Sequence, residues 1–152
     1  MVRGFGEVVS GGLLIVVLIA SGFPPLDAEA QTTLPLARVR TQVATAKAHA
    51  GFAASAAALT DFQQHMGHVL NCVEGKGGKN FNAKWGHVCE GQGNGILADL
   101  REVPGRADLL PLVQQIGLNA LGATMSSRLN DAATDVAEGV EAMLEMVEGS
   151  LK

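Results

Sequence analysis

Two of the four histidines and one of the two cysteines lie in the segment HMGHVLNC, residues 65–72. With the preceding acid they form the series Asp61, His65, His68 and Cys72, at spacings of four, three and four residues. A helix of ~3.6 residues per turn would place these four side chains in one stripe. Imidazoles at i and i+3 can chelate one metal ion, and a carboxylate one turn earlier can be a further ligand or orient a ligand. This stretch predicts a metal site at His65 and His68 with support from Asp61.

The two cysteines, Cys72 and Cys89, predict a disulfide, because an even number of cysteines in an exported chain usually pairs. The bridge would close a loop over residues 73–88 and stabilise the fold by roughly 3 kcal/mol. It would also draw His87 towards the helix end that carries His68, so His87 is expected to join the metal site. If the cysteines were reduced, a Cys2His2-like ligand set would be the alternative.

The ion expected at this site is zinc, copper or iron, since imidazole suits all three. Haem b held between helices is the secondary expectation, and covalent haem attachment is excluded because the chain has no C-x-x-C-H motif. The competing interpretation is that His65 and His68 are ordinary solvated residues, because they flank the local apolar face. His49 is expected to be such a surface residue unless the helix bends near Gly51.

Other kinds of chemistry find no support in the sequence. Residues 75–80, GKGGKN, lack the phosphate-loop pattern, and residues 91–95, GQGNG, lack the context of a dinucleotide site. No hydroxyl nucleophile is locally paired with a histidine and an acid, so we do not expect an enzyme. The net charge is −4, Tyr is absent, and no basic stripe is interleaved with aromatic residues, which excludes nucleic acid as a partner.

Residues 1–30 have the organisation of a secretory signal peptide. Arg3 precedes the apolar run GLLIVVLIA at 12–20, two prolines end the apolar stretch at 24–25, and AEA at 28–30 offers an A-x-A cleavage site. The run is shorter than the ~20 residues that a spanning helix needs. We therefore expect cleavage, a periplasmic or secreted location, and no membrane span in the mature chain, with a retained anchor as the alternative. Cleavage would remove one of 11 basic and three of 15 acidic residues, leaving a formal charge of −2.

Residues 31–152 are expected to form a single all-α domain, an antiparallel bundle of about four helical segments. The composition favours helix, and the alternating β-branched runs typical of strands are absent. Residues 33–73 carry apolar faces that differ in direction between their two halves, which predicts either a break near Gly51 or one long helix with two buried sides. The Gly- and Asn-rich residues 74–95 are expected to form the disulfide-tied loop. Further helices are expected at about 108–125 and 129–150, and the second is acidic on its outer face.

The segment AKAHAGFAASAA followed by H-x-x-H resembles small exported helical proteins that bind metals through helix-borne histidines. The likeness covers about residues 44–72, and those proteins are much richer in histidine. It implies a metal-binding role and transfers no specific ligand.

The leading hypothesis is a small exported helical protein that binds a metal ion for buffering, delivery or electron transfer. The alternative is a structural or interaction protein of the cell envelope, which would present its acidic last helix or the tied loop to a partner. An Ala-rich helical face also fits a homodimer.

Overall fold

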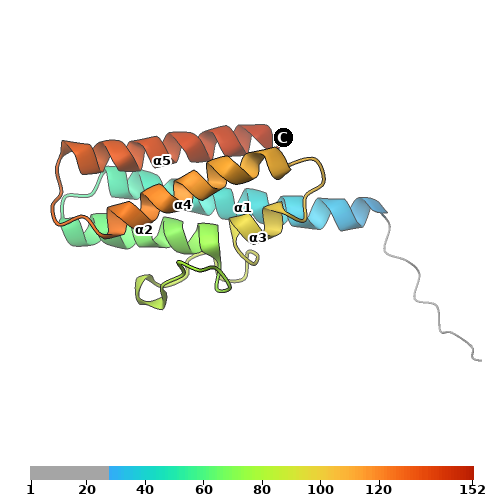
Figure 1. Cartoon of the computed structure of the whole chain (residues 1–152), viewed down its shortest axis with the longest axis horizontal. Helices are drawn as coiled ribbons and strands as arrows, with labels where there is room; N and C mark the ends of the chain where they lie inside the picture. The colour runs from blue at the N-terminus through green and yellow to red at the C-terminus, as the bar shows by residue number, and fades with distance from the viewer. Residues whose placement is uncertain (1–27) are drawn as a thin grey trace, which may run out of the picture.

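The computed structural model describes residues 28–152, and within them the chain forms helices and no strands. The helices are α1 (Ala28–Ala54), α2 (Leu59–Glu74), α3 (Ile96–Leu100), α4 (Leu110–Thr124) and α5 (Asp131–Ser150), with short 3-10 helices η1 (Ala83–Trp85) and η2 (Ala107–Leu109). The four long helices lie side by side and alternate in direction (Figure 1). The expected all-α antiparallel bundle is confirmed.

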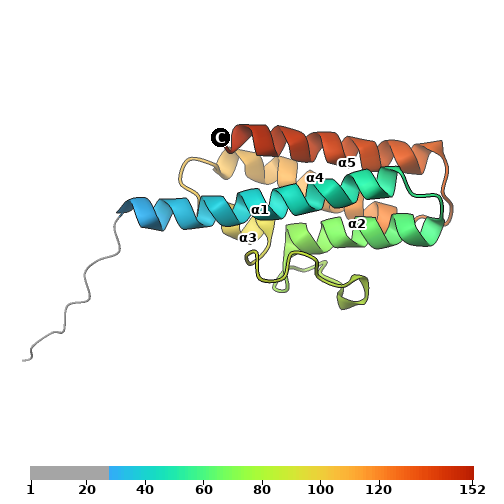
Figure 2. The same ribbon diagram turned by 180° about the vertical axis from the view of Figure 1, so that it is seen from behind.

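The α1–α2 hairpin buries the apolar faces that its sequence predicts. The fully buried residues are Val39, Val43, Ala46, Ala50 and Ala53 on α1, and Phe62, Met66, Val69 and Val73 on α2. The helix does not break at Gly51: α1 runs through it to Ala54, and the chain reverses over residues 55–58. On a single continuous helix the two apolar faces would point in different directions. Because the chain reverses between α1 and α2, both faces point into one core. Seen from behind, α1 lies between α2 and α5 (Figure 2).

The second hairpin, α4–α5, also reverses where its sequence predicts. Asn130 caps α5, since its side chain accepts a hydrogen bond from the backbone N–H of Ala133. The acidic face of α5 is exposed at Asp135, Glu138 and Glu145. The helical spacing of the apolar residues predicts a buried face that includes Val136, Val140, Met143, Val147 and Leu151. Val140, Val147 and Leu151 are fully buried, but Leu144 is buried where Met143 was expected, and Val136 is 38% exposed.

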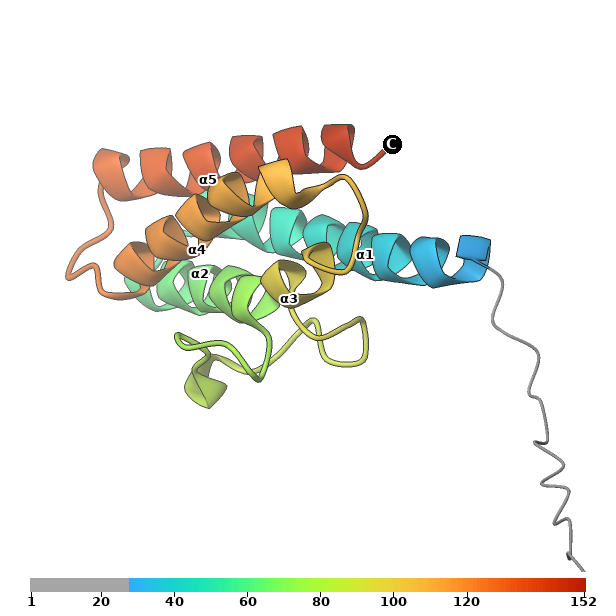
Figure 3. The ribbon, with the colours of Figure 1, turned by 45° about the vertical axis from the view of Figure 1, so that its right-hand side comes forward.

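The loop between α2 and α3 folds back onto the outside of the bundle (Figure 3). A disulfide joins Cys72 on α2 to Cys89 in the loop, which confirms the predicted pair, and both residues are fully buried. Asn71, also buried, donates through Nδ2 to the carbonyl oxygens of Asn82 (2.8 Å) and Gly86 (2.5 Å). The loop is therefore fastened to the last turns of α2 by one covalent bond and by hydrogen bonds.

A buried polar contact fixes the far end of the loop to α1. Gln42 on α1 donates to Asp99 on α3 at 2.7 Å, and both side chains are fully buried. Asp99 also accepts from the backbone N–H of Asn94 at 2.9 Å, and Gln42 accepts from the N–H of Gly95 at 3.0 Å. These contacts satisfy polar groups that would be costly to bury alone.

The predicted signal peptide falls almost entirely on residues 1–27, which lie outside the described residues, so it stays a prediction. Among the helices that the structure describes, none combines the length and the apolar character needed to cross a membrane.

Candidate metal centre

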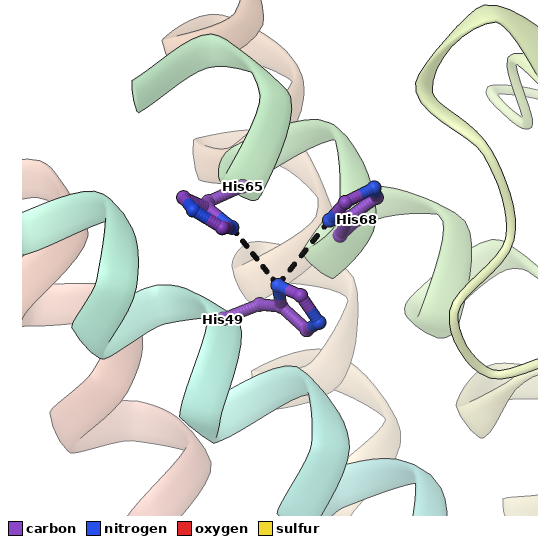
Figure 4. A group of neighbouring side chains, drawn as sticks. All are labelled: His49, His65 and His68. Atoms are coloured by element: carbon purple, nitrogen blue, oxygen red, sulfur yellow. Dashed lines mark hydrogen bonds between the residues drawn. The ribbon is translucent and has the colours of Figure 1, made fainter. Parts of the chain in front are cut away.

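The α1–α2 hairpin brings three histidines together from two helices. Nδ1 of His49 on α1 lies 3.0 Å from Nδ1 of His65 and 3.2 Å from Nδ1 of His68, both on α2 (Figure 4). One ligand atom from each ring lies within 4.8 Å of the other two. We call His49, His65 and His68 the histidine triad.

Two of the three nitrogen separations in the histidine triad are close to those of ligands on a single ion. A tetrahedral ion with metal–nitrogen bonds of ~2.0–2.1 Å holds its ligand nitrogens ~3.3 Å apart. The separations of 3.0 and 3.2 Å from His49 Nδ1 are close to this value, and all three ligand atoms lie within 4.8 Å of one another. The histidine triad could therefore hold a metal ion.

The histidine triad is partly buried and flanked by an aromatic ring. Phe52, one turn after His49 on α1, lies edge-on to the His49 ring with centroids 5.5 Å apart, and its centroid is 5.3 Å from that of His65. Phe52 is itself 56% exposed, and the three histidines are half-buried. The site thus lies near the surface, beside an apolar side chain that limits the water around it.

The tied loop forms the wall on the His68 side. Trp85 packs directly on Gly67 of α2, where an added Cβ would lie 2.2 Å from Trp85 Cγ, so only glycine fits there. The side-chain nitrogen of Gln64 donates to the Trp85 carbonyl oxygen at 2.7 Å and lies 2.9 Å from His68 Nε2. The loop backbone therefore reaches the outer edge of the His68 ring.

Burial and mutual proximity favour the neutral form of these imidazoles. Burial, with the nearby His68 and His65, lowers the pKa of His49 to about 4. Burial and the neighbouring His65 also lower the pKa of His68, partly opposed by the Trp85 carbonyl. A neutral imidazole is the form that binds metal, so protons compete less with an ion here than at an ordinary histidine.

These pKa shifts predict that the metal-free protein loses stability in acid. In the unfolded chain histidine takes up a proton near pH 6.5, whereas folded His49 does so only near pH 4. Between these values the unfolded state binds more protons, so the contribution of His49 makes the free energy of unfolding fall as the pH drops from 6.5 to 4. Urea unfolding at several pH values measures this fall. The variant H49N/H68N should show a shallower fall, and an identical slope would contradict the assignment.

Two residues predicted for the site lie outside the histidine triad. Asp61 is exposed in the first turn of α2. The disulfide does bring the loop to His68, since a Cβ on Gly86 would lie 3.7 Å from His68 Nε2. His87 itself instead contacts Phe81, with ring centroids 5.3 Å apart, and within the described residues its ring nitrogens have no hydrogen-bond partner. Burial lowers the pKa of His87 as well.

The residue that the sequence reasoning missed is His49. On one continuous helical wheel, His49 lies away from the stripe formed by Asp61, His65, His68 and Cys72. That comparison does not apply here, because the chain reverses between His49 and His65. The usable signal is its distance from the turn: His49 precedes residues 55–58 by about as many residues as His65 follows them. In an antiparallel helical hairpin such residues lie side by side.

Comparisons with protein-family models, with curated proteins and with solved structures found no match to this chain.

Proposed function

We propose that this protein is an exported metal-binding protein that holds one divalent transition-metal ion through Nδ1 of His49, His65 and His68. The observation that carries the proposal is the convergence of three Nδ1 atoms from two helices, at separations of 3.0 and 3.2 Å. Ring nitrogens from two helices that face one another offer a donor set for one ion, and neutral imidazole is the form that binds metal.

The ligand set favours a zinc or copper ion that can exchange. Neutral imidazoles suit Zn²⁺ and Cu²⁺, and carboxylate-preferring ions such as Mg²⁺ and Ca²⁺ are disfavoured. Within the described residues no carboxylate or thiolate belongs to the group. Three protein ligands leave one tetrahedral position for water or for an incoming ligand. This arrangement supports buffering or delivery of the ion.

A bare ion fits better than haem. An axial haem histidine approaches the iron of a flat macrocycle, whereas here three ring nitrogens face one another with no gap that would admit a macrocycle between them. Export is supported by the Cys72–Cys89 disulfide, since such bonds persist in oxidising compartments. The role we propose is binding without turnover of a substrate.

A second candidate function, interaction with another protein, is favoured by one surface. Leu118 and Met125 of the second hairpin are 57% and 70% exposed, and with Val136 they line a groove of about 560 Å³ between α4 and α5. Exposed apolar patches of this kind often mark protein contacts. No residue that lines the groove belongs to the histidine triad, so the two functions do not exclude each other.

Titration of the metal-stripped protein with Zn²⁺ in competition with a chromophoric chelator tests the proposed function. We expect one equivalent per chain, a rise in the free energy of unfolding with zinc concentration, and tetrahedral absorption bands when Co²⁺ replaces Zn²⁺. An optical spectrum of the protein as isolated, with elemental analysis, distinguishes haem, which gives a Soret band, from a bare ion. Absence of uptake would refute the proposal and leave protein interaction as the remaining candidate.

A further inference from the structure

Gln64 lies between the His68 ring and the backbone of the tied loop, where its amide defines how the ring is protonated. Its side-chain nitrogen is 2.7 Å from the Trp85 carbonyl oxygen and 2.9 Å from His68 Nε2. A carbonyl oxygen can only accept, which places the amide NH2 group on this side. One hydrogen then goes to Trp85 and the other faces Nε2, an arrangement that favours Nε2 as the acceptor and the His68 proton on Nδ1.

The position of the His68 proton also determines the role of His49. His68 Nδ1–H faces His49 Nδ1 at 3.2 Å, so His49 Nδ1 carries a lone pair and accepts. In the metal-free protein the inward-facing nitrogen of His68 therefore carries hydrogen. A metal ion needs a lone pair from each inward-facing nitrogen, so the His68 proton must move to Nε2, where the Gln64 amide opposes it.

Gln64 cannot relieve this conflict without losing contacts, because its acceptor is held in place. Trp85 packs on Gly67. Asn71 accepts from the N–H of Asn82 at 2.9 Å and donates to the neighbouring Gly86 carbonyl. An amide that turned its oxygen to His68 Nε2–H would give up the hydrogen bond to the Trp85 carbonyl.

We propose that Gln64 restrains the metal affinity of the histidine triad by stabilising the His68 tautomer that cannot bind the ion. The proposal rests on the metal-binding function proposed above and adds the residue that tunes it. A restrained affinity suits an ion that must be released to a receiver.

The decisive variant is Gln64→Glu, whose carboxylate accepts from His68 Nε2–H and so favours the binding tautomer. Outer carboxylate partners of metal-bound histidines commonly change affinity by ~10–100-fold, and we expect Q64E to bind Zn²⁺ at least about tenfold tighter than the wild type. The matched control is Gln63→Glu. Gln63 is the adjacent residue on α2, is equally half-buried, and donates to a backbone carbonyl, that of Ser126, at 2.8 Å. Q63E adds the same charge without facing His68, and we expect it to change affinity by less than about threefold.

A spectroscopic measurement separates this role from a structural one. Nitrogen-15 NMR of the metal-free protein should show the His68 proton on Nδ1 in wild type and in Q63E, and on Nε2 in Q64E. Equal zinc affinities of Q64E and Q63E, or a wild-type His68 already protonated on Nε2, would overturn the proposal. If the wild type binds no zinc, the proposed function fails, while the NMR result still decides whether Gln64 sets the tautomer.

Discussion

Replacing His49 by alanine is expected to lower the affinity for Zn²⁺ by at least about 100-fold, equivalent to about 2.7 kcal/mol. His49 Nδ1 is the atom nearest to both other ligands, at 3.0 and 3.2 Å, so its loss leaves two ligands on a single helix. Two imidazoles and water bind zinc far more weakly than three preorganised imidazoles. Competition with a chromophoric chelator at pH 7 measures the change.

The informative control is His87→Ala. His87 is also a half-buried histidine, and it lies beside the disulfide, yet it is outside the histidine triad. H87A should retain wild-type affinity, and the double variant H65A/H68A should abolish binding. An equal loss of affinity in H87A and H49A would mean that the loop supplies a ligand and that the assignment to the α1–α2 hairpin is wrong.

Removing the disulfide is expected to lower the free energy of unfolding by about 3 kcal/mol, because the bond closes a loop with a sequence separation of 17 residues. The double variant C72A/C89A also loses side chains that are fully buried at the α2 end of the core. Urea unfolding curves of the wild type and of C72A/C89A, fitted with a common dependence of the free energy on urea concentration (m), measure the loss of stability.

The metal site should survive this change. No cysteine belongs to the histidine triad, so C72A/C89A should still take up one equivalent of Zn²⁺. Wild-type protein reduced with a dithiol provides the control, since it loses the bond and keeps both sulfur atoms. If C72A/C89A lost zinc binding while staying folded, the geometry of the histidine triad would depend on the tied loop.

Much of the fold could be predicted from local patterns. The apolar residues of α1 and α2 recur at helical spacing, and those named above for each face are buried. The pairing of Cys72 with Cys89 followed from there being only two cysteines. The break before α5 was equally visible, because the apolar directions of the two flanking segments are incompatible with one straight helix.

The candidate site could be predicted only in part. His65 and His68 lie one turn apart on one helix, so their closeness is a local property that helical geometry imposes. The contribution of His49 depends on where α1 ends and how α1 rotates against α2, and small shifts in either would move its ring away from both partners. The break was expected near Gly51, but α1 continues to Ala54. Glycine only weakens a helix, and the core packing of α1 keeps it intact past Gly51.

Local sequence patterns were enough to predict the helices, most of their buried faces, the disulfide and the two histidines that share one helical stripe. The packing of α1 and of the tied loop against α2 brings His49 into the group and leaves Asp61 and His87 outside it. The same packing places Gln64 and the Trp85 carbonyl beside the ring of His68. The physical reason is that backbone periodicity fixes neighbours along one helix. Which residues become neighbours across two helices depends on where the chain turns and on how the apolar faces of the two helices pack together.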